Sequence, residues 1–103
     1  MKKISQKEFK SEVTDTTGVV VVDVFADWCG PCKLLKPTLE KLAASGIAKF
    51  VIVDADSEPE LVSQHNVSAF PTLLFFKDGI LNQKVTGLQS EALIKKTIED
   101  MCK

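Results

Sequence analysis

The hydrophobic pattern divides the first part of the chain into a strand, a helix and a second strand. A capping-box pair, Ser5 and Glu8, comes before apolar residues at helical spacing, so we expect a helix over residues 6–14, with Ile4 in a short strand before it. Residues 19–25 form a β-branched run without polar alternation. Such a run is typical of a central strand that is buried on both faces of a sheet.

Two segments of different period follow in the middle of the chain. After the second cysteine, apolar residues recur at helical spacing until Gly46, which suits the end of a helix. Residues 49–53 are predicted to form a second buried strand. Ser57 and Glu60 resemble another capping box, which predicts a short helix to about residue 65.

The last third of the chain contains a hairpin pattern and an amphipathic pattern. Residues 72–77 and 83–86 flank the turn signal Asp78-Gly79, which predicts an antiparallel hairpin. Ser90 is expected to cap a last helix with an apolar side formed by Leu93, Ile94, Ile98 and Met101. This order predicts an α/β fold whose central mixed sheet is parallel in its first part, ends in the hairpin and carries helices on both faces.

Composition narrows the class of protein. The chain has 103 residues, of which 45% are hydrophobic and 26% are charged, so we expect a single domain over residues 1–103. All 13 basic residues are lysines and the net charge is −1, which argues against nucleic acid as the partner. The start of the chain lacks the apolar stretch of a signal peptide and no aliphatic run could span a bilayer, so we expect a cytoplasmic protein without membrane contact.

The cysteines are the feature that this composition leaves to be explained. The chain has three, and Cys29 and Cys32 have the C-x-x-C spacing of metal sites and redox sites. The pair lies where a buried strand ends and a helix begins, at the sheet edge where α/β proteins place their sites. One helical turn brings two such side chains close enough to form or break a disulfide with little backbone movement.

The two cysteines are expected to have different roles. Cys29 lies at the helix N-terminus, where free N–H groups and the helix dipole favour a thiolate, so it is the candidate nucleophile. Cys32 lies one turn inside the helix, so we expect the more shielded sulfur and the resolving thiol there. Gly30 and Pro31 form the turn between them, and the fixed φ of Pro31 stiffens it.

Asp23 interrupts the apolar run at residues 19–25, six positions before Cys29. Burial of a carboxylate is costly and raises its pKa, so Asp23 is a candidate proton acceptor for Cys32. A hydrogen bond between Asp23 and a helix end, with no part in catalysis, is the alternative.

Two other residues have plain interpretations that we prefer. His65 could join the cysteines as a zinc ligand, but it lacks metal-like spacing, and we expect a solvated residue at a helix end. Cys102 follows Ile94 and Ile98 at four-residue intervals, which favours a partly buried position on the last helix over a reactive or dimer-forming surface thiol.

The segment Ala26-Asp27-Trp28-Cys29-Gly30-Pro31-Cys32-Lys33 resembles the active-site segment of the thioredoxin family. The resemblance spans the chain, because further family motifs occur in the right order at Asp23, Pro37, Phe70-Pro71-Thr72, Lys77-Asp78-Gly79 and Gly87. It implies the thioredoxin fold and a protein-disulfide reductase that works through Cys29 and Cys32.

The resemblance also implies how clients bind. Pro71 would be cis and lie against the cysteines, the backbone around Phe70 would pair with an extended client segment, and Trp28 and Gly87 would border an apolar groove. Phe70 is bulkier than the aliphatic residue common at its position, which could narrow the choice of clients. Many members carry a charged residue, often lysine, where this chain has Ile52, so we expect Asp23 to lack a cationic partner.

The partners follow from the same resemblance. It implies no bound cofactor, with electrons supplied from NADPH by a flavin-containing thioredoxin reductase. Ribonucleotide reductase, peroxiredoxin and methionine sulfoxide reductase would be clients of a cytoplasmic monomer. A thioredoxin-fold binding module without catalysis, a structural zinc site and a secreted oxidase or isomerase are the alternatives.

Overall fold

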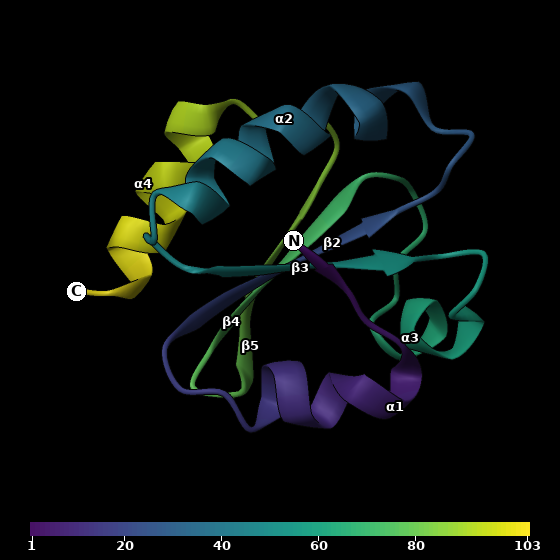
Figure 1. Ribbon diagram of the computed structural model, residues 1–103, viewed down its shortest axis with the longest axis horizontal. Helices are drawn as coiled ribbons and strands as arrows, with labels where there is room; N and C mark the ends of the chain where they lie inside the picture. The colour runs from purple at the N-terminus through teal and green to yellow at the C-terminus, as the bar shows by residue number, and fades with distance from the viewer.

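A five-stranded mixed sheet forms the centre of the computed structural model, which describes residues 1–103 (Figure 1). Its strands are β1 (Lys2–Lys3), β2 (Val19–Phe25), β3 (Lys49–Asp54), β4 (Thr72–Lys77) and β5 (Ile80–Thr86), in the order β1-β3-β2-β4-β5. β1, β3 and β2 run parallel, whereas β4 is antiparallel to both β2 and β5. The predicted mixed sheet with a terminal hairpin is therefore confirmed.

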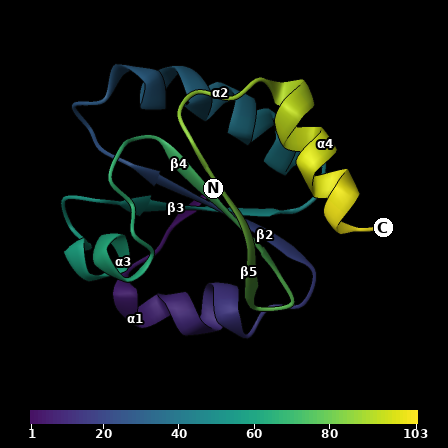
Figure 2. The ribbon, with the colours of Figure 1, turned by 180° about the vertical axis from the view of Figure 1, so that it is seen from behind.

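Helices cover both faces of this sheet, as predicted. They are α1 (Gln6–Phe9), which continues into the π-helix η1 (Lys10–Thr14), then α2 (Gly30–Ala44), α3 (Pro59–Gln64) and α4 (Glu91–Met101). α1, η1 and α3 lie on one face, and α2 and α4 lie on the other, which both views show (Figures 1 and 2). The first helix is capped as expected, because the Glu8 carboxylate accepts hydrogen bonds from the backbone N–H and the hydroxyl of Ser5.

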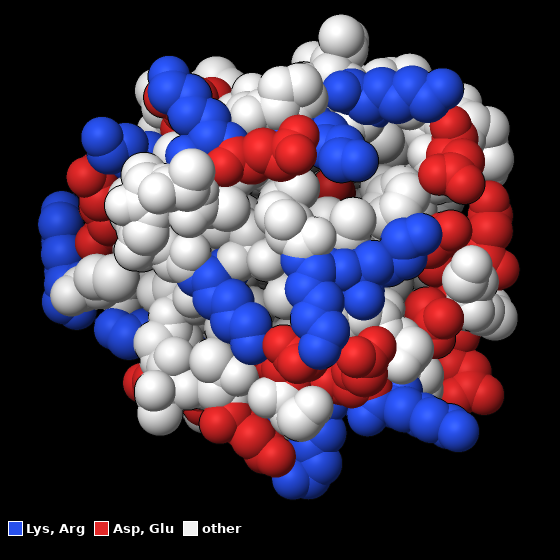
Figure 3. All heavy atoms as spheres, viewed as in Figure 1, with Lys and Arg blue, Asp and Glu red and all other residues white.

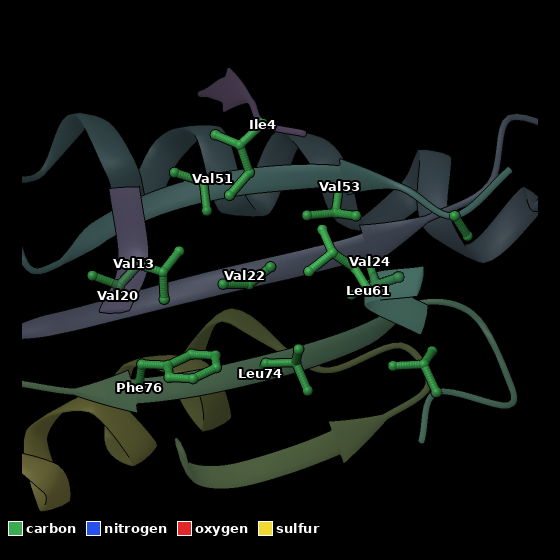
Figure 4. Packing of buried hydrophobic residues seen from close by; sticks show 12 residues of the cluster. Ile4, Val13, Val20, Val22, Val24, Val51, Val53, Leu61, Leu74 and Phe76 are labelled. Atoms are coloured by element: carbon green, nitrogen blue, oxygen red, sulfur yellow. The ribbon is translucent and has the colours of Figure 1, made fainter. Parts of the chain in front are cut away.

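Residues of the central strand β2 alternate between the two faces and so contribute to two hydrophobic clusters. Val20, Val22 and Val24 pack with Ile4, Val13, Leu61 and side chains of β3 and β4 (Figure 4). Val19 and Val21 pack with residues of α2 and α4 on the opposite face. Because side chains repeat every second residue along a strand, Asp23 also lies on the face that α2 covers.

Three predicted details are wrong. α3 is capped at Glu58 rather than Ser57, and the Glu58 carboxylate instead accepts the backbone N–H of Gln6. β5 begins at Ile80, directly after the turn, so the hairpin is longer than residues 83–86 indicate. Leu93 is exposed on α4, because Ile94, Ile98 and Met101 alone fill the stripe that faces the sheet.

The β4–β5 turn is attached to the end of η1 and to the residue before β2. The Asp78 carboxylate accepts the Gly18 N–H at 2.7 Å, and the Asp78 N–H donates to the Gly18 carbonyl at 3.0 Å. Gly79 has φ +83° and its Cα faces the Thr14 carbonyl so closely that an added Cβ would overlap that oxygen. The turn therefore needs glycine at this position for both conformation and space.

No helix is both long enough and apolar enough to pass through a membrane. On the face seen in Figure 3, lysines and carboxylates are interspersed, and acidic side chains gather on the right, over α3 and the ends of β2 and β3.

Candidate active site

The end of β2 and the start of α2 place the two cysteines. β2 ends at Phe25, a turn follows in which the Cys29 N–H donates to the Ala26 carbonyl, and α2 begins at Gly30. Cys29 is therefore the N-cap residue of α2, and Cys32 lies in its first turn. The two residues are joined by a disulfide, with Cα atoms 5.3 Å apart.

The start of α2 favours negative charge on the Cys29 sulfur. Cys29 Sγ accepts a hydrogen bond from the backbone N–H of Cys32 at 3.2 Å. It also lies at the positive end of a helix of 15 residues. Both effects stabilise a thiolate at Cys29 once the disulfide is reduced. Exposure does not distinguish the pair, because Cys29 is 4% and Cys32 5% exposed, so the expectation of a more shielded Cys32 is not confirmed.

Asp23 is a buried carboxyl group without compensation from its own sheet. It is 3% exposed, and its neighbours on β3 and β4 are Ile52 and Leu73, both apolar. Its Oδ1 atom has no hydrogen-bond partner, which does not support the alternative of a hydrogen bond to a helix end. Burial raises the pKa of Asp23 to about 7, so the predicted upward shift is confirmed.

Asp23 and Cys32 line one pocket of about 220 Å³. The other residues that line it are Phe25, Ala26, Asp27, Lys33, Lys36 and Ile52. Since a water molecule occupies roughly 30 Å³ in the liquid, the pocket has room for water to link the two side chains. The geometry therefore offers a route for a proton between Cys32 and Asp23.

Lys36 is the residue of this pocket that the sequence interpretation missed. We expected no cation near Asp23 because Ile52 is apolar, and that expectation is wrong: the positive charge of Lys36 lowers the pKa of Asp23, against the larger effect of burial. The spacing held the signal, because Lys36 follows Cys32 by four residues and so lies on the same face of α2.

Aromatic side chains form the surface beside the disulfide. Trp28 is 69% exposed, and its ring forms a T-shaped pair with the Phe70 ring, with centroids 5.8 Å apart. Phe70 packs against the small cluster of Ala26, Cys29 and Cys32. The Phe70–Pro71 peptide bond is cis, as the family resemblance implied.

Gly87 lies beside this proline loop. Its N–H donates to the Pro71 carbonyl at 2.8 Å, and its φ of +97° is one that glycine adopts freely. The backbone N–H and C=O of Phe70 make no hydrogen bond within the chain. The structure thus places Trp28 and Phe70 beside the cysteines, with the unpaired backbone groups of Phe70 between them and the buried Pro71. Gly87 adjoins this site through its hydrogen bond to Pro71.

His65 and Cys102 lie away from this site. His65 is half-buried, with ring centroids 5.2 Å from Phe9 and 5.9 Å from Phe76, so it is a packing residue rather than the solvated one we expected. Cys102 is exposed, which corrects the expectation of partial burial: α4 ends at Met101, and Met101 takes the buried place. No three His, Cys, Asp or Glu side chains are grouped as a metal site.

The fold and the site together define a class of protein. A C-x-x-C disulfide at the N-terminus of a helix, at the edge of a mixed sheet and beside a cis-proline loop, is the arrangement of a thiol-disulfide oxidoreductase.

Comparison with known proteins gives the family. The family model for thioredoxin matches residues 1–100. Thioredoxin of Chlamydia trachomatis is 44% identical over 94 residues, which are 89% of this chain and 90% of that protein. Thioredoxin of Staphylococcus aureus is 38% identical over 99 residues, 94% of this chain and 93% of that protein. A solved mutant thioredoxin from Halobacterium salinarum has a TM-score of 0.88 at 38% identity and covers 96% of this chain and 89% of that one.

The chain belongs to the thioredoxin family and is a protein-disulfide oxidoreductase with a redox-active cysteine pair. No feature of the site favours the alternative of a non-catalytic binding module.

Proposed function

We propose that this chain reduces client disulfides through an attack by Cys29 and a resolution step by Cys32. The observation that carries this assignment is the position of Cys29 at the N-cap of α2, with its sulfur accepting the Cys32 N–H. Only Cys29 has both the helix terminus and a backbone donor to stabilise its thiolate.

The exchange proceeds in two steps. The Cys29 thiolate attacks one sulfur of a client disulfide, forms a mixed disulfide and releases the second client sulfur as a thiolate that takes a proton from water. Cys32, once deprotonated, attacks the Cys29 sulfur and breaks the bond to the client. The client leaves with two thiols, and the cysteine pair of this chain is oxidised to the disulfide seen in the structure.

Asp23 is the proposed acceptor of the Cys32 proton in the second step. It lines the same pocket as Cys32, and its pKa of about 7 means that both protonation states are populated near neutral pH. A base with a pKa near the working pH transfers protons most effectively. Gly30 and Pro31 form the start of α2 and hold the two sulfurs one turn apart.

The client would bind at the loop of Phe70 and the buried Pro71, with Trp28 and Gly87 at its borders. The unpaired N–H and C=O of Phe70 support this proposal, because an extended client segment could pair with them whatever its sequence. The exposed Trp28 ring adds apolar contact, which is also independent of sequence. The bulk of Phe70 would favour clients with small residues next to the disulfide.

The electron source and the partners are proposed from membership of the family. Electrons would come from NADPH through a thioredoxin reductase, with no cofactor bound to this chain. Ribonucleotide reductase, peroxiredoxin and methionine sulfoxide reductase are the proposed clients. We place the protein in the cytoplasm as a monomer with one domain over residues 1–103.

Turnover of a model protein disulfide tests the mechanism. The variant Cys29→Ser should lose activity by on the order of 100-fold or more, because no other sulfur is activated by the helix terminus. The variant Cys32→Ser should also stop turning over, because the mixed disulfide is not resolved. Cys102→Ser is the matched control and should keep full activity, since Cys102 is exposed at the end of α4 and belongs neither to the cysteine cluster nor to the pocket. Full activity of Cys29→Ser would refute the proposed mechanism.

A further inference from the structure

The charged residues of the pocket beside the disulfide are unevenly placed around Asp23. Its two sheet neighbours, Ile52 and Leu73, are apolar, so they leave the carboxyl group uncompensated from the sides. The charged residues that line the pocket with it are Asp27, Lys33 and Lys36. The first of these is a second carboxylate, so any compensation for Asp23 has to come from α2.

Of the two lysines, Lys36 is the better placed. Lys36 is four residues from Cys32, so it lies almost directly above that cysteine along one face of the helix. Lys33 follows Cys32 immediately and is turned by about 100° around the helix axis. Lys36 is exposed and lines the pocket together with Asp23 and Cys32. A long, flexible lysine side chain can line a pocket with its stem while its ammonium group stays in contact with solvent.

We propose, building on the resolution step above, that Lys36 is a positioning residue: its ammonium group keeps Asp23 in the charged form that accepts the Cys32 proton. The unpartnered Oδ1 of Asp23 supports this assignment, because a buried carboxylate without hydrogen bonds depends on a nearby positive charge to remain ionised. Lys36 is also the one charged residue that shifts the pKa of Asp23, and it does so downward.

The consequence concerns the pH range of resolution. With Lys36 in place, a larger fraction of Asp23 is ionised at neutral pH, and Cys32 loses its proton to that fraction. Without Lys36, burial acts alone, the midpoint of Asp23 ionisation rises, and the resolution step needs a higher pH. The Cys29 sulfur is stabilised by the helix terminus and the Cys32 N–H, so loss of Lys36 should leave the attack by Cys29 unchanged.

Titration of Asp23 in the oxidised protein tests the proposal without turnover, because neither active-site thiol then titrates. The probe is the carboxyl carbon resonance of labelled aspartate, assigned by its disappearance in Asp23→Asn. Lys36→Met keeps the apolar stem and should raise the midpoint by about 0.5 pH unit, a modest shift because the lysine is exposed to solvent. Lys36→Arg keeps the charge and should leave the midpoint where it is.

Two further variants separate local charge from other effects. Lys95→Met removes the same charge from an exposed site on α4, and the midpoint should not move. Lys36→Met combined with Ile52→Lys places a cation on β3, beside Asp23 in the sheet, and should bring the midpoint back down. In single-turnover release of a client, Lys36→Met should be slower by about 3-fold below the midpoint and equal to wild type well above it, since half a pH unit is a factor of about three.

Two results would overturn the proposal. One is an Asp23 midpoint in Lys36→Met that equals that of the wild type, and the other is a midpoint that rises as much in Lys36→Arg as in Lys36→Met. Either result leaves the proposed roles of Cys29 and Cys32 intact, because those are measured by the turnover of the cysteine variants. Conversely, full activity of Cys29→Ser would refute the proposed mechanism of disulfide reduction. The titration of Asp23 would still measure whether Lys36 lowers the pKa of Asp23.

Discussion

The pKa values of carboxyl groups are shifted in opposite directions at the two ends of the central strands. Near the amino ends of β2 and β3, Glu12 of η1 accepts hydrogen bonds from Lys2 at 2.8 Å and from Lys49 at 3.0 Å, and these lysines lower its pKa. Toward the carboxyl ends, Asp23 is buried without a partner for Oδ1, and its pKa is raised. One end satisfies its charges, whereas the other keeps a carboxyl group that can change charge.

This difference predicts opposite dependence of stability on pH at the two ends. A carboxyl group whose pKa is lowered on folding contributes stability above its usual pKa and loses it as the pH falls, which is the case of Glu12. A carboxyl group whose pKa is raised binds more protons in the folded state, so its ionisation reduces stability as the pH rises from 4 towards 7, which is the case of Asp23. The reactive end is thus maintained at a cost in stability.

The largest expected effect is a gain in the free energy of unfolding when the buried charge of Asp23 is removed. Asp23→Asn should raise the free energy of unfolding at about pH 8 by up to about 4 kcal/mol, since each unit of pKa shift corresponds to about 1.4 kcal/mol and the pKa rises from 3.8 to about 7. The gain should shrink to near zero at about pH 4, where Asp23 is protonated in the folded state. Urea unfolding of the oxidised protein at the two pH values measures it, and an equal gain at both would contradict the account.

The next effect concerns the tight contact at the amino end. Gly79→Ala should lower the free energy of unfolding by roughly 3 kcal/mol, because the new Cβ would overlap the Thr14 carbonyl and φ is positive. Gly46→Ala is the matched control, with a φ of +76° and open space around it, and should cost only about 1 kcal/mol. Urea midpoints compare the two, and equal losses would show that the contact with Thr14 is unimportant.

The smallest effect concerns the ion pairs at the amino end. Glu12→Gln should reduce stability by less than either change above, because the pairs with Lys2 and Lys49 are exposed to solvent. The loss should vanish at about 1 M salt, where charges are screened beyond about 3 Å, and should also fade as the pH drops below 4. Glu40→Gln, at an exposed position of α2, serves as the control. A loss that salt does not change would argue against ion pairing.

Periodicity and local motifs were enough to predict most of the fold. The β-branched run at residues 19–25 predicted the central strand, and Asp78-Gly79 predicted the hairpin, because both signals are local and strong. The predicted capping box at Ser57 was wrong because a tertiary contact determines the conformation of that turn. The Glu58 carboxylate accepts a hydrogen bond from the N–H of Gln6, which is far away in the sequence. The predicted partial burial of Cys102 was wrong because helical spacing does not indicate where a helix ends, and α4 ends at Met101.

In the candidate site, too, some features could be predicted from the local sequence and others could not. The places of Cys29 and Cys32 follow from the strand-to-helix transition, and the burial of Asp23 follows from the apolar run around it. The pairing of Gly87 with Pro71 and the presence of Lys36 in the pocket depend on how separate elements pack. The motif alone identifies the two cysteines, whereas the environment of Asp23 depends on packing between β2, β3 and α2.

Trapping of the mixed disulfide tests the central claim that the N-cap position makes Cys29 the attacking sulfur. Cys32→Ser and Cys29→Ser, both combined with Cys102→Ser, are mixed in reduced form with a disulfide-containing model client, and adducts are located by peptide mass mapping. We expect a one-to-one adduct at Cys29 that accumulates in Cys32→Ser and is released by dithiothreitol. Formation of an adduct at Cys32 in Cys29→Ser at the same rate would contradict it.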